Sequence, residues 1–192
     1  MGTTVAVVLA GGAGTRYAGP TPKLLAPLPG GTTVLGRAVA AAVDAGIGPV
    51  VVVTGAVVDP DLPAVVELVA NPRWAEGQAT SLRTAVAWAA DAGADAVVVG
   101  LGDQPALSPA AWRAVAAADA TPLAVATYAG RRGHPVRLGR AVWDELPATG
   151  DVGAREVLRA RAAEVVEVPC PGDPADIDTV ADLARFTTGG PL

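Results

Sequence analysis

Runs of apolar, β-branched residues alternate with alanine-rich stretches along this chain, and that alternation restricts its fold more than any other feature. The apolar runs have the length of strands and carry almost no polar positions, which indicates strands buried on both faces. Helices that connect such strands cover both sides of a parallel sheet. The sequence therefore predicts an α/β protein with three layers, α/β/α, and a mostly parallel sheet.

The individual elements are predicted from periodicity and from residues that start or stop helices. A turn at 130–133 would pair two strands as a hairpin, whereas residues 55–64 resist assignment. The chain is expected to form a single domain over 1–192, in which residues 187–192 are a frayed tail. Strands are expected at 5–9, 50–54, 65–69, 96–100, 123–128, 134–138 and 165–168, and helices at 32–45, 81–92, 108–118, 140–146, 153–162 and 179–186.

The first strand runs directly into a glycine-rich segment that carries two cations. Gly11, Gly12 and Gly14 follow the strand, and Arg16 and Lys23 come after them. Glycines let backbone amides approach a ligand closely, and such amides form a nest of donors for phosphate oxygens. The two cations would neutralise a triphosphate and its departing pyrophosphate. The segment thus indicates a nucleoside triphosphate site, with a tight structural turn as the alternative.

Two common phosphate-binding motifs are absent from this segment. A Walker loop ends in Gly-Lys-Ser or Gly-Lys-Thr, which does not occur here, and the dinucleotide fingerprint fails because Tyr17 stands where its last glycine is required.

Acidic residues follow at two further points of the chain. Asp103 comes just after the predicted strand 96–100, at the sheet edge where ligands of open α/β proteins bind. Mg²⁺ is held by one or two carboxylates together with substrate phosphates, so Asp103 is a candidate magnesium ligand. Asp176 and Asp178 share one side of an extended segment, and one of them would complete the site. The alternative is that Asp178 or Thr179 caps the last helix.

Charge and cysteine content exclude several classes of partner. A net charge of −5 argues against broad adhesion to nucleic acid or anionic lipid, and no apolar run has the length of a membrane span. The single cysteine, Cys170, cannot form an internal disulfide, and no Cys/His cluster suits zinc. A cytoplasmic location without nucleic-acid or membrane partners is expected.

Several motifs together resemble the MobA-like nucleotidyltransferases, and within them the molybdenum cofactor cytidylyltransferase branch. They span nearly the whole chain in the order found in that family, which makes the set far more specific than any one motif. They are LAGGAGTR with Lys23, NPRWAEGQATSLR at 71–83, GDQP at 102–105, RRGHP at 131–135, GDVGAR at 150–155 and DIDTVADL at 176–183.

The resemblance implies a Rossmann-like fold of the nucleotide-diphospho-sugar transferase type and gives roles to particular residues. Arg16, Lys23 and Asp103 would be catalytic, and Asp103 would bind Mg²⁺ with Asp178, or with Asp176 as the alternative. His134, Asp151 and Arg155 would bind the acceptor. The nucleotide would contact Leu9, Ala10, Gly11, Gly12, Ala13, Gly14, Thr15, Arg16, Lys23, Asn71, Gly77, Thr80, Ser81, Gly102 and Asp103.

Three functions stay open at this point. The first is transfer of CMP from CTP to the molybdenum-pterin cofactor, with transient contact to a molybdenum hydroxylase that receives the product. The second is guanylyl transfer from GTP to the same pterin, or to a small phosphorylated acid such as phosphoenolpyruvate or phospholactate in deazaflavin cofactor synthesis. The third is a non-catalytic nucleotide-binding accessory module, which retention of Lys23, Asp103 and the two later aspartates disfavours.

Overall fold

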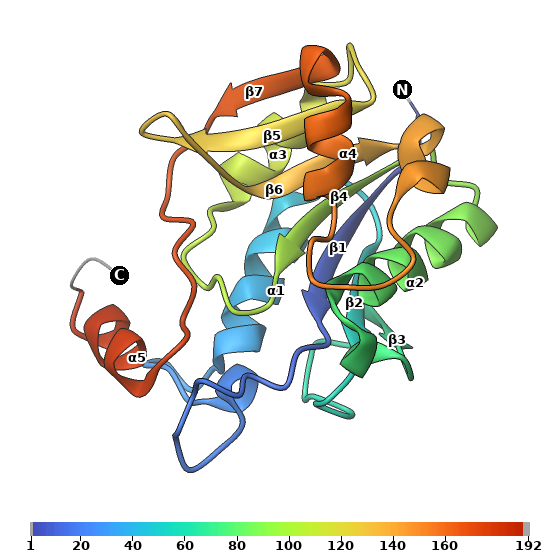
Figure 1. Cartoon of the computed structure of the whole chain (residues 1–192). Helices are drawn as coiled ribbons and strands as arrows, with labels where there is room; N and C mark the ends of the chain where they lie inside the picture. The colour runs from blue at the N-terminus through green and yellow to red at the C-terminus, as the bar shows by residue number, and fades with distance from the viewer. Residues whose placement is uncertain (1, 190–192) are drawn as a thin grey trace.

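The computed structural model describes residues 2–189 and contains a seven-stranded sheet with the strand order β3-β2-β1-β4-β6-β5-β7 (Figure 1). All neighbouring strands run parallel except β6, which is antiparallel to both β4 and β5. The strands are β1 (Thr4–Ala10), β2 (Val50–Thr54), β3 (Val66–Ala70), β4 (Ala96–Leu101), β5 (Leu123–Tyr128), β6 (Arg131–Gly139) and β7 (Val165–Pro169).

Helices cover both faces of the sheet, which confirms the three-layer prediction. Side chains of α2 (Gln78–Asp91), the 3₁₀ helix η3 (Arg140–Glu145) and α4 (Arg155–Ala160) pack with one face of the strands. Side chains of α1 (Val34–Ala45) and α3 (Pro109–Ala117) pack with the other. Alternate residues of β1 belong to the two clusters, Val5 and Val7 to one and Ala6 and Val8 to the other. Burial on both faces explains why the central strands are almost purely apolar.

The strand order creates a gap at the carboxyl edge of the sheet. The chain adds β2 and β3 on one side of β1 and then crosses to add β4 on the other side. The order in which strands are added therefore reverses between β1 and β4, and open α/β proteins bind ligands at such a switch point. Val7 pairs with Val51 on one side and with Val99 on the other, so the register of the three strands sets the ends that flank the gap.

Several boundaries differ from the sequence prediction for identifiable reasons. Helix α2 begins at Gln78 rather than at residue 81, because a distant loop supplies partners for its first amide groups. Strand β6 begins at Arg131, so the hairpin includes the residues expected in the turn. The segment near 140–146 is a 3₁₀ helix in which Trp143 donates its indole N–H to the Leu138 carbonyl at 3.0 Å.

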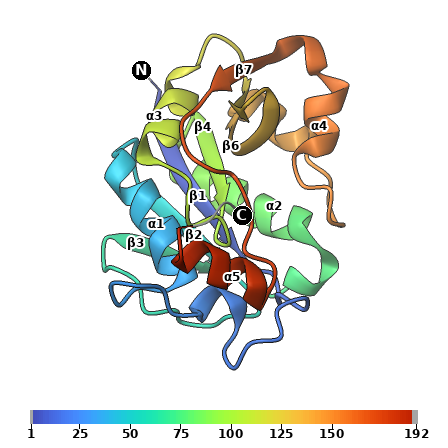
Figure 2. The same cartoon turned by 90° about the vertical axis from the view of Figure 1, so that its left-hand side faces the viewer.

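The last part of the chain packs apart from the main core. From β7 the chain runs extended along the molecule to α5 (Val180–Thr187), which lies near the beginning of α1 (Figure 2). A small cluster holds it there, in which Ile177 is fully buried with Ala26, Leu28 and Val34, and Tyr17, Leu183 and Phe186 pack against them. Thr187 is the last residue of α5, and the part of the expected tail at 190–192 lies outside the described residues.

Besides η3, residues 2–189 contain three short 3₁₀ helices. They are η1 (Lys23–Leu25), η2 (Trp74–Glu76) and η4 (Ala162–Glu164), and η4 precedes β7. Within residues 2–189 no helix is long and apolar enough to cross a membrane.

Candidate functional site

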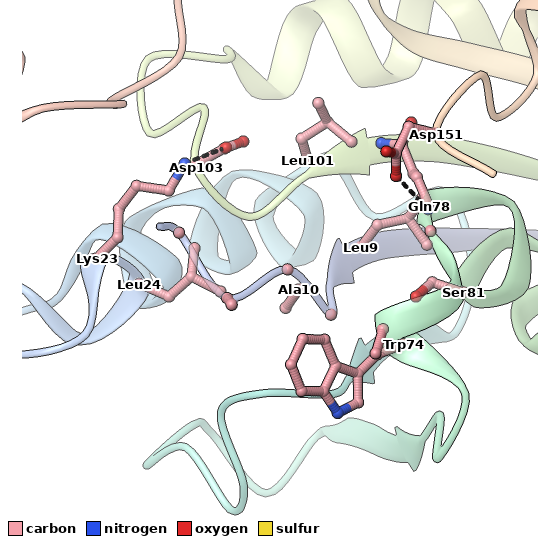
Figure 3. Close-up of a pocket in the computed structure, with 16 residues that line it drawn as sticks. Leu9, Ala10, Lys23, Leu24, Trp74, Gln78, Ser81, Leu101, Asp103 and Asp151 are labelled. Carbon is pink, nitrogen blue, oxygen red and sulfur yellow. Dashed lines mark hydrogen bonds and ion pairs between the residues drawn. The ribbon is translucent and has the colours of Figure 1, made fainter. Parts of the chain in front are cut away.

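A cavity of about 290 Å³ opens at the carboxyl ends of β1 and β4, at the switch point of the sheet (Figure 3). Its walls come from four places: the end of β1 with the glycine loop, η1, η2 with the start of α2, and the residues that follow β4. Eleven of the residues predicted for the site line it: Leu9, Ala10, Gly11, Gly12, Ala13, Gly14, Lys23, Gly77, Ser81, Asp103 and Asp151.

Gly14 lets the loop fold closely over the stem of Lys23. Its φ of +62° lies in the left-handed region, and a Cβ at this position would come within 3.1 Å of the Lys23 Cβ. A larger residue would therefore combine backbone strain with crowding of the lysine. Gly12 is different, because a Cβ there would meet nothing within 4 Å. Of these two glycines, Gly14 is therefore the one that packs against Lys23.

Lys23 forms two ion pairs that join three parts of the chain. Its Nζ lies 2.7 Å from Oδ2 of Asp103 and 3.1 Å from Oδ1 of Asp178, and its side chain is only 9% exposed. Burial alone would lower the pKa of Lys23, but the charge and hydrogen bond of Asp103, reinforced by Asp178, raise that pKa above its ordinary value. The ammonium group is therefore charged at neutral pH.

Arg16 contacts one of these carboxylates, Asp178, from the solvent side. Its Nη1 lies 2.8 Å from Oδ2 of Asp178, and its side chain is 75% exposed. Thr15 is exposed beside it. Both cations predicted for a triphosphate thus contact Asp178, Lys23 as a buried residue that lines the cavity and Arg16 as an exposed residue outside the lining.

A polar anchor fastens the extended segment that carries Asp178. Gln104 is 4% exposed and donates from Nε2 to the Pro174 carbonyl at 2.6 Å and to Oδ1 of Asp176 at 2.8 Å. The Ile177 amide donates to the Asp103 carbonyl at 2.9 Å. Asp178 rather than Asp176 therefore contacts Lys23. Desolvation and the nearby charge of Asp103 raise the pKa of Asp176.

Adjacent residues cap the last helix and form the ion pairs: Thr179 is the cap, and Asp178 is the ion-pair partner. Thr179 is the N-cap of α5, and its hydroxyl accepts the Asp182 amide while the Asp182 carboxylate accepts the Thr179 amide. Because Thr179 performs the capping, the side chain of Asp178 is left to face Arg16 and Lys23.

The two carboxylates suit a divalent cation that is also bound by phosphate. Asp103 and Asp178 are each 22% exposed and contact the same ammonium nitrogen, so their oxygens lie close together. Within residues 2–189 no group of three or more His, Cys, Asp or Glu side chains forms a metal site from protein ligands alone. Two carboxylates completed by substrate oxygens are the usual arrangement for Mg²⁺.

Asn71 and Thr80 lie behind the cavity wall rather than in it. Asn71 is 3% exposed and donates from Nδ2 to the hydroxyl oxygens of Thr80 at 2.8 Å and of Ser81 at 3.0 Å. Of these three residues, only Ser81 lines the cavity. Gly102 also lies beneath the surface, where its amide donates to the Leu9 carbonyl at 2.9 Å and a Cβ would crowd Leu35.

The loop at 150–153 closes the opposite end of the cavity against α2. Oδ1 of Asp151 accepts the Gln78 amide at 3.3 Å, and the Gly150 carbonyl accepts the Ala79 amide at 2.9 Å. These bonds satisfy amides that a helix start otherwise leaves unpaired. Gly77 has a φ of +106°, and a Cβ there would lie 2.4 Å from the Gly150 carbonyl carbon, so the contact requires glycine.

His134 lies on β6, outside the cavity lining, and Arg155 begins α4. Burial lowers the pKa of His134 to about 4; Asp103 opposes this shift and Arg155 adds to it. His134 is therefore neutral at pH 7. Arg155 is exposed.

Five lining residues lie outside the predicted set: Leu24, Trp74, Ala75, Gln78 and Leu101. Trp74, Ala75 and Gln78 lie inside the motif at 71–83 but received no role there. Leu24 and Leu101 adjoin predicted residues. Trp74 is the largest, and its ring lies below Ala10 in Figure 3.

A glycine loop, two cations and paired carboxylates at the switch point of this sheet define a nucleotidyltransferase-type α/β protein. A model of the MobA-like NTP transferase domain matches residues 6–165, and the chain belongs to this family of nucleotidyltransferases. A comparison with curated proteins gave no match.

Solved structures agree with this assignment. Rv0371c from Mycobacterium tuberculosis H37Rv is 33% identical with a TM-score of 0.81, and the match covers 97% of this chain and 98% of that chain. A structure of Rv0371c in complex with manganese gives 31% identity over 97% and 98% of the two chains, with a TM-score of 0.75.

A structure with lower sequence identity to this chain is described as a nucleotidyl transferase. Mth528, a nucleotidyl transferase from a Methanothermobacter species, is 26% identical over 97% of both chains with a TM-score of 0.78. The inositol-1-phosphate CTP transferase from T. maritima is 16% identical over 98% of both chains, with a TM-score of 0.68, and shares the fold.

Proposed function

We propose that this protein transfers CMP from CTP to the molybdenum-pterin cofactor, releasing pyrophosphate in a reaction that requires Mg²⁺. The observation that carries the proposal is the contact of buried Lys23 with both Asp103 and Asp178 at the end of the glycine loop. A triphosphate that follows the loop would bring its negative charge to this point.

The chain's own residues would perform the reaction by positioning and charge. A phosphate oxygen of the acceptor forms a bond to the α-phosphorus of CTP, and the bond from that phosphorus to the oxygen bridging to the β-phosphorus breaks. Pyrophosphate leaves with the electron pair of that bond. The acceptor phosphate is already ionised at neutral pH, so no general base is needed. Lys23 and Arg16 would stabilise the charge that develops on the leaving group.

A divalent cation held by Asp103 and Asp178 would supply further charge neutralisation on the phosphates. The manganese complex of Rv0371c supports a divalent cation in this family. The backbone amides of Gly11, Gly12 and Gly14 would hold the nucleotide against these groups.

The acceptor proposal depends on the segments 131–135 and 150–155. They resemble the cytidylyltransferase branch. Asp151 lines the cavity, and Arg155 lies close enough to His134 to lower the pKa of its imidazole. A transient complex with a molybdenum hydroxylase, in the cytoplasm, would then receive the product.

Two measurements test the proposal in sequence. The melting temperature is recorded with CTP, GTP, ATP or UTP, with and without Mg²⁺, because a ligand stabilises the state that it binds. Pyrophosphate release is then measured with the molybdenum-pterin cofactor, using Asp103→Asn as the control. A selective response to CTP and release that is lost in Asp103→Asn would support the proposal. Preference for GTP would contradict the cytidylyl assignment, and release by neither nucleotide would contradict the transferase function.

A further inference from the structure

We propose that Asn71 is a positioning residue that turns the Ser81 hydroxyl into a hydrogen-bond donor for the nucleotide. The inference rests on the proposed function, since it takes the cavity to be the nucleotide site. Under it, Asn71 does not touch the nucleotide, although it belongs to the motif that predicts nucleotide contact.

The orientation of the Asn71 amide follows from its three partners. Its Oδ1 accepts the backbone amide of Arg73 at 2.9 Å, so the NH₂ group must lie on the other side. That group donates to the hydroxyl oxygens of Thr80 at 2.8 Å and Ser81 at 3.0 Å. Both protons of the amide are therefore used, and Asn71 cannot accept a hydrogen from either hydroxyl through its nitrogen.

The two hydroxyls differ in where their own protons go. Thr80 donates to a carbonyl, with Gly77 at 2.9 Å and Arg73 at 3.0 Å both in reach. Among residues 2–189, the Ser81 hydroxyl donates no hydrogen bond to the protein and only accepts one, from Asn71. Since Ser81 already accepts from Asn71, the proton of its hydroxyl is directed away from that amide and is the donor left without a partner. Ser81 is 3% exposed, so an unmade hydrogen bond there is costly.

The Ser81 side chain points toward the glycine loop. Figure 3 shows it extending from α2 into the space beside Ala10 and above Trp74. A Cβ on Gly11 would lie 2.6 Å from the Ser81 oxygen, so glycine at this position leaves the hydroxyl uncovered. The donor therefore faces the part of the cavity that the loop would share with the nucleotide.

A fixed donor at this point selects a ligand atom that accepts a hydrogen bond. A base carbonyl oxygen or an unprotonated ring nitrogen satisfies it, as cytosine provides at O2 and N3. An amino group or a protonated ring nitrogen at the same place offers no acceptor for the Ser81 proton, which stays without a partner and selects against that base. Asn71 would thus contribute to base choice through Ser81.

The substitution Asn71→Asp tests this route because it keeps the shape and reverses the polarity. An aspartate accepts hydrogen bonds from both hydroxyls, so the Ser81 proton turns away from the cavity. We expect Ser81→Ala and Asn71→Asp each to raise the CTP dissociation constant about tenfold. The double variant should bind no more weakly than either single variant, since both remove the same donor. Binding is measured calorimetrically at pH 8, where an aspartate is ionised.

Thr84→Ala is the matched control, because its hydroxyl is also on α2 but donates to the Thr80 carbonyl at 2.9 Å and does not line the cavity. It should leave the dissociation constant unchanged. If the increases in the CTP dissociation constant multiply in the double variant, the inference is overturned. Asn71 would then affect binding even without the Ser81 hydroxyl, as a purely structural residue does. If Asn71→Asp does not fold, Ser81→Ala decides alone. Reduced discrimination among CTP, UTP, GTP and ATP by Ser81→Ala supports the inference. A CTP dissociation constant that is unchanged in Ser81→Ala overturns it.

The proposed function and the role of Asn71 are contradicted by different results. A wild-type protein that binds none of the four nucleotides would contradict the proposed function itself. Binding by the wild type with no coupling between positions 71 and 81 would contradict only the role given to Asn71.

Discussion

The Nζ of Lys23 lies 2.7 Å from Oδ2 of Asp103, although 80 residues separate them in the chain. Asp178 contacts the same nitrogen at 3.1 Å. The ammonium group thus lies between two carboxylates that suit a divalent cation. Phosphate oxygens would offer Lys23 new partners and leave the carboxylates to the cation, so binding of nucleotide and cation should be mutually favourable.

Lys23 is the only lysine in the chain, which makes its environment measurable by amine chemistry. Asp103 raises the pKa of Lys23, so Asp103→Asn should lower that pKa and increase the fraction of neutral, reactive amine. We expect reductive methylation of Lys23 at pH 8.5 to be several times faster in Asp103→Asn, as followed by peptide mass spectrometry. Asp144→Asn serves as a control with the same charge change. Equal rates in Asp103→Asn and the wild type would contradict the ion pair.

The three aspartates near Lys23 should differ in their effect on catalysis. Asp103→Asn and Asp178→Asn each remove a carboxylate that faces the proposed phosphate end, and we expect each to reduce pyrophosphate release about 100-fold or more. Asp176→Asn should reduce it less than about tenfold, because that side chain is bonded to Gln104. The rates are compared at saturating Mg²⁺. A loss in Asp176→Asn as large as in Asp178→Asn would reassign the second ligand.

Two neighbouring glycines should respond differently to one added methyl group. Gly11→Ala places a Cβ 2.6 Å from the Ser81 oxygen and should lower the free energy of unfolding by about 1–3 kcal/mol. Gly12→Ala meets nothing within 4 Å and should change it by less than about 0.5 kcal/mol. Denaturant unfolding without nucleotide measures both. Equal destabilisation by the two changes would contradict the packing described for the loop.

His134 should make stability depend on pH in the mildly acidic range. Its pKa falls from 6.5 to about 4 on folding, so between these values the unfolded chain binds the additional proton. This contribution to stability is complete above pH 6.5 and is lost as the pH falls toward 4. The decrease from pH 6.5 to 5 should be about 1–2 kcal/mol larger in the wild type than in His134→Gln. Parallel unfolding curves for the two proteins across this range would show that His134 is accessible to protons in the folded state.

The fold could be predicted largely because burial on both faces leaves a direct record in the sequence. The runs at Val50–Thr54 and Leu123–Tyr128 are buried throughout and coincide with the predicted strands. The start of α2 could not be found this way, because Asp151 and Gly150 supply its first hydrogen bonds from more than 70 residues away. Local sequence carries no sign of such a partner.

In the candidate site, too, some features could be predicted from the sequence and others could not. Motif residues such as Gly11 and Asp103 line the cavity because they directly follow strands that end at its edge. Asn71 and Thr80 belong to an equally specific motif, yet their side chains turn inward and bond to each other. A motif locates the backbone, whereas the direction of each side chain depends on packing that only the folded chain defines. The roles given to these residues remain predictions.

The last strand of the sheet ends at Pro169, and Asp178 follows it in the chain. In the order of synthesis, all seven strands therefore leave the ribosome before the second carboxylate does. A nascent chain that has just completed its sheet can pair Lys23 only with Asp103. The fully buried Ile177 and its bond to the Asp103 carbonyl then bring Asp178 into place. Competence to hold a polyphosphate with its cation would thus be the last property that this protein acquires, after its architecture is already built.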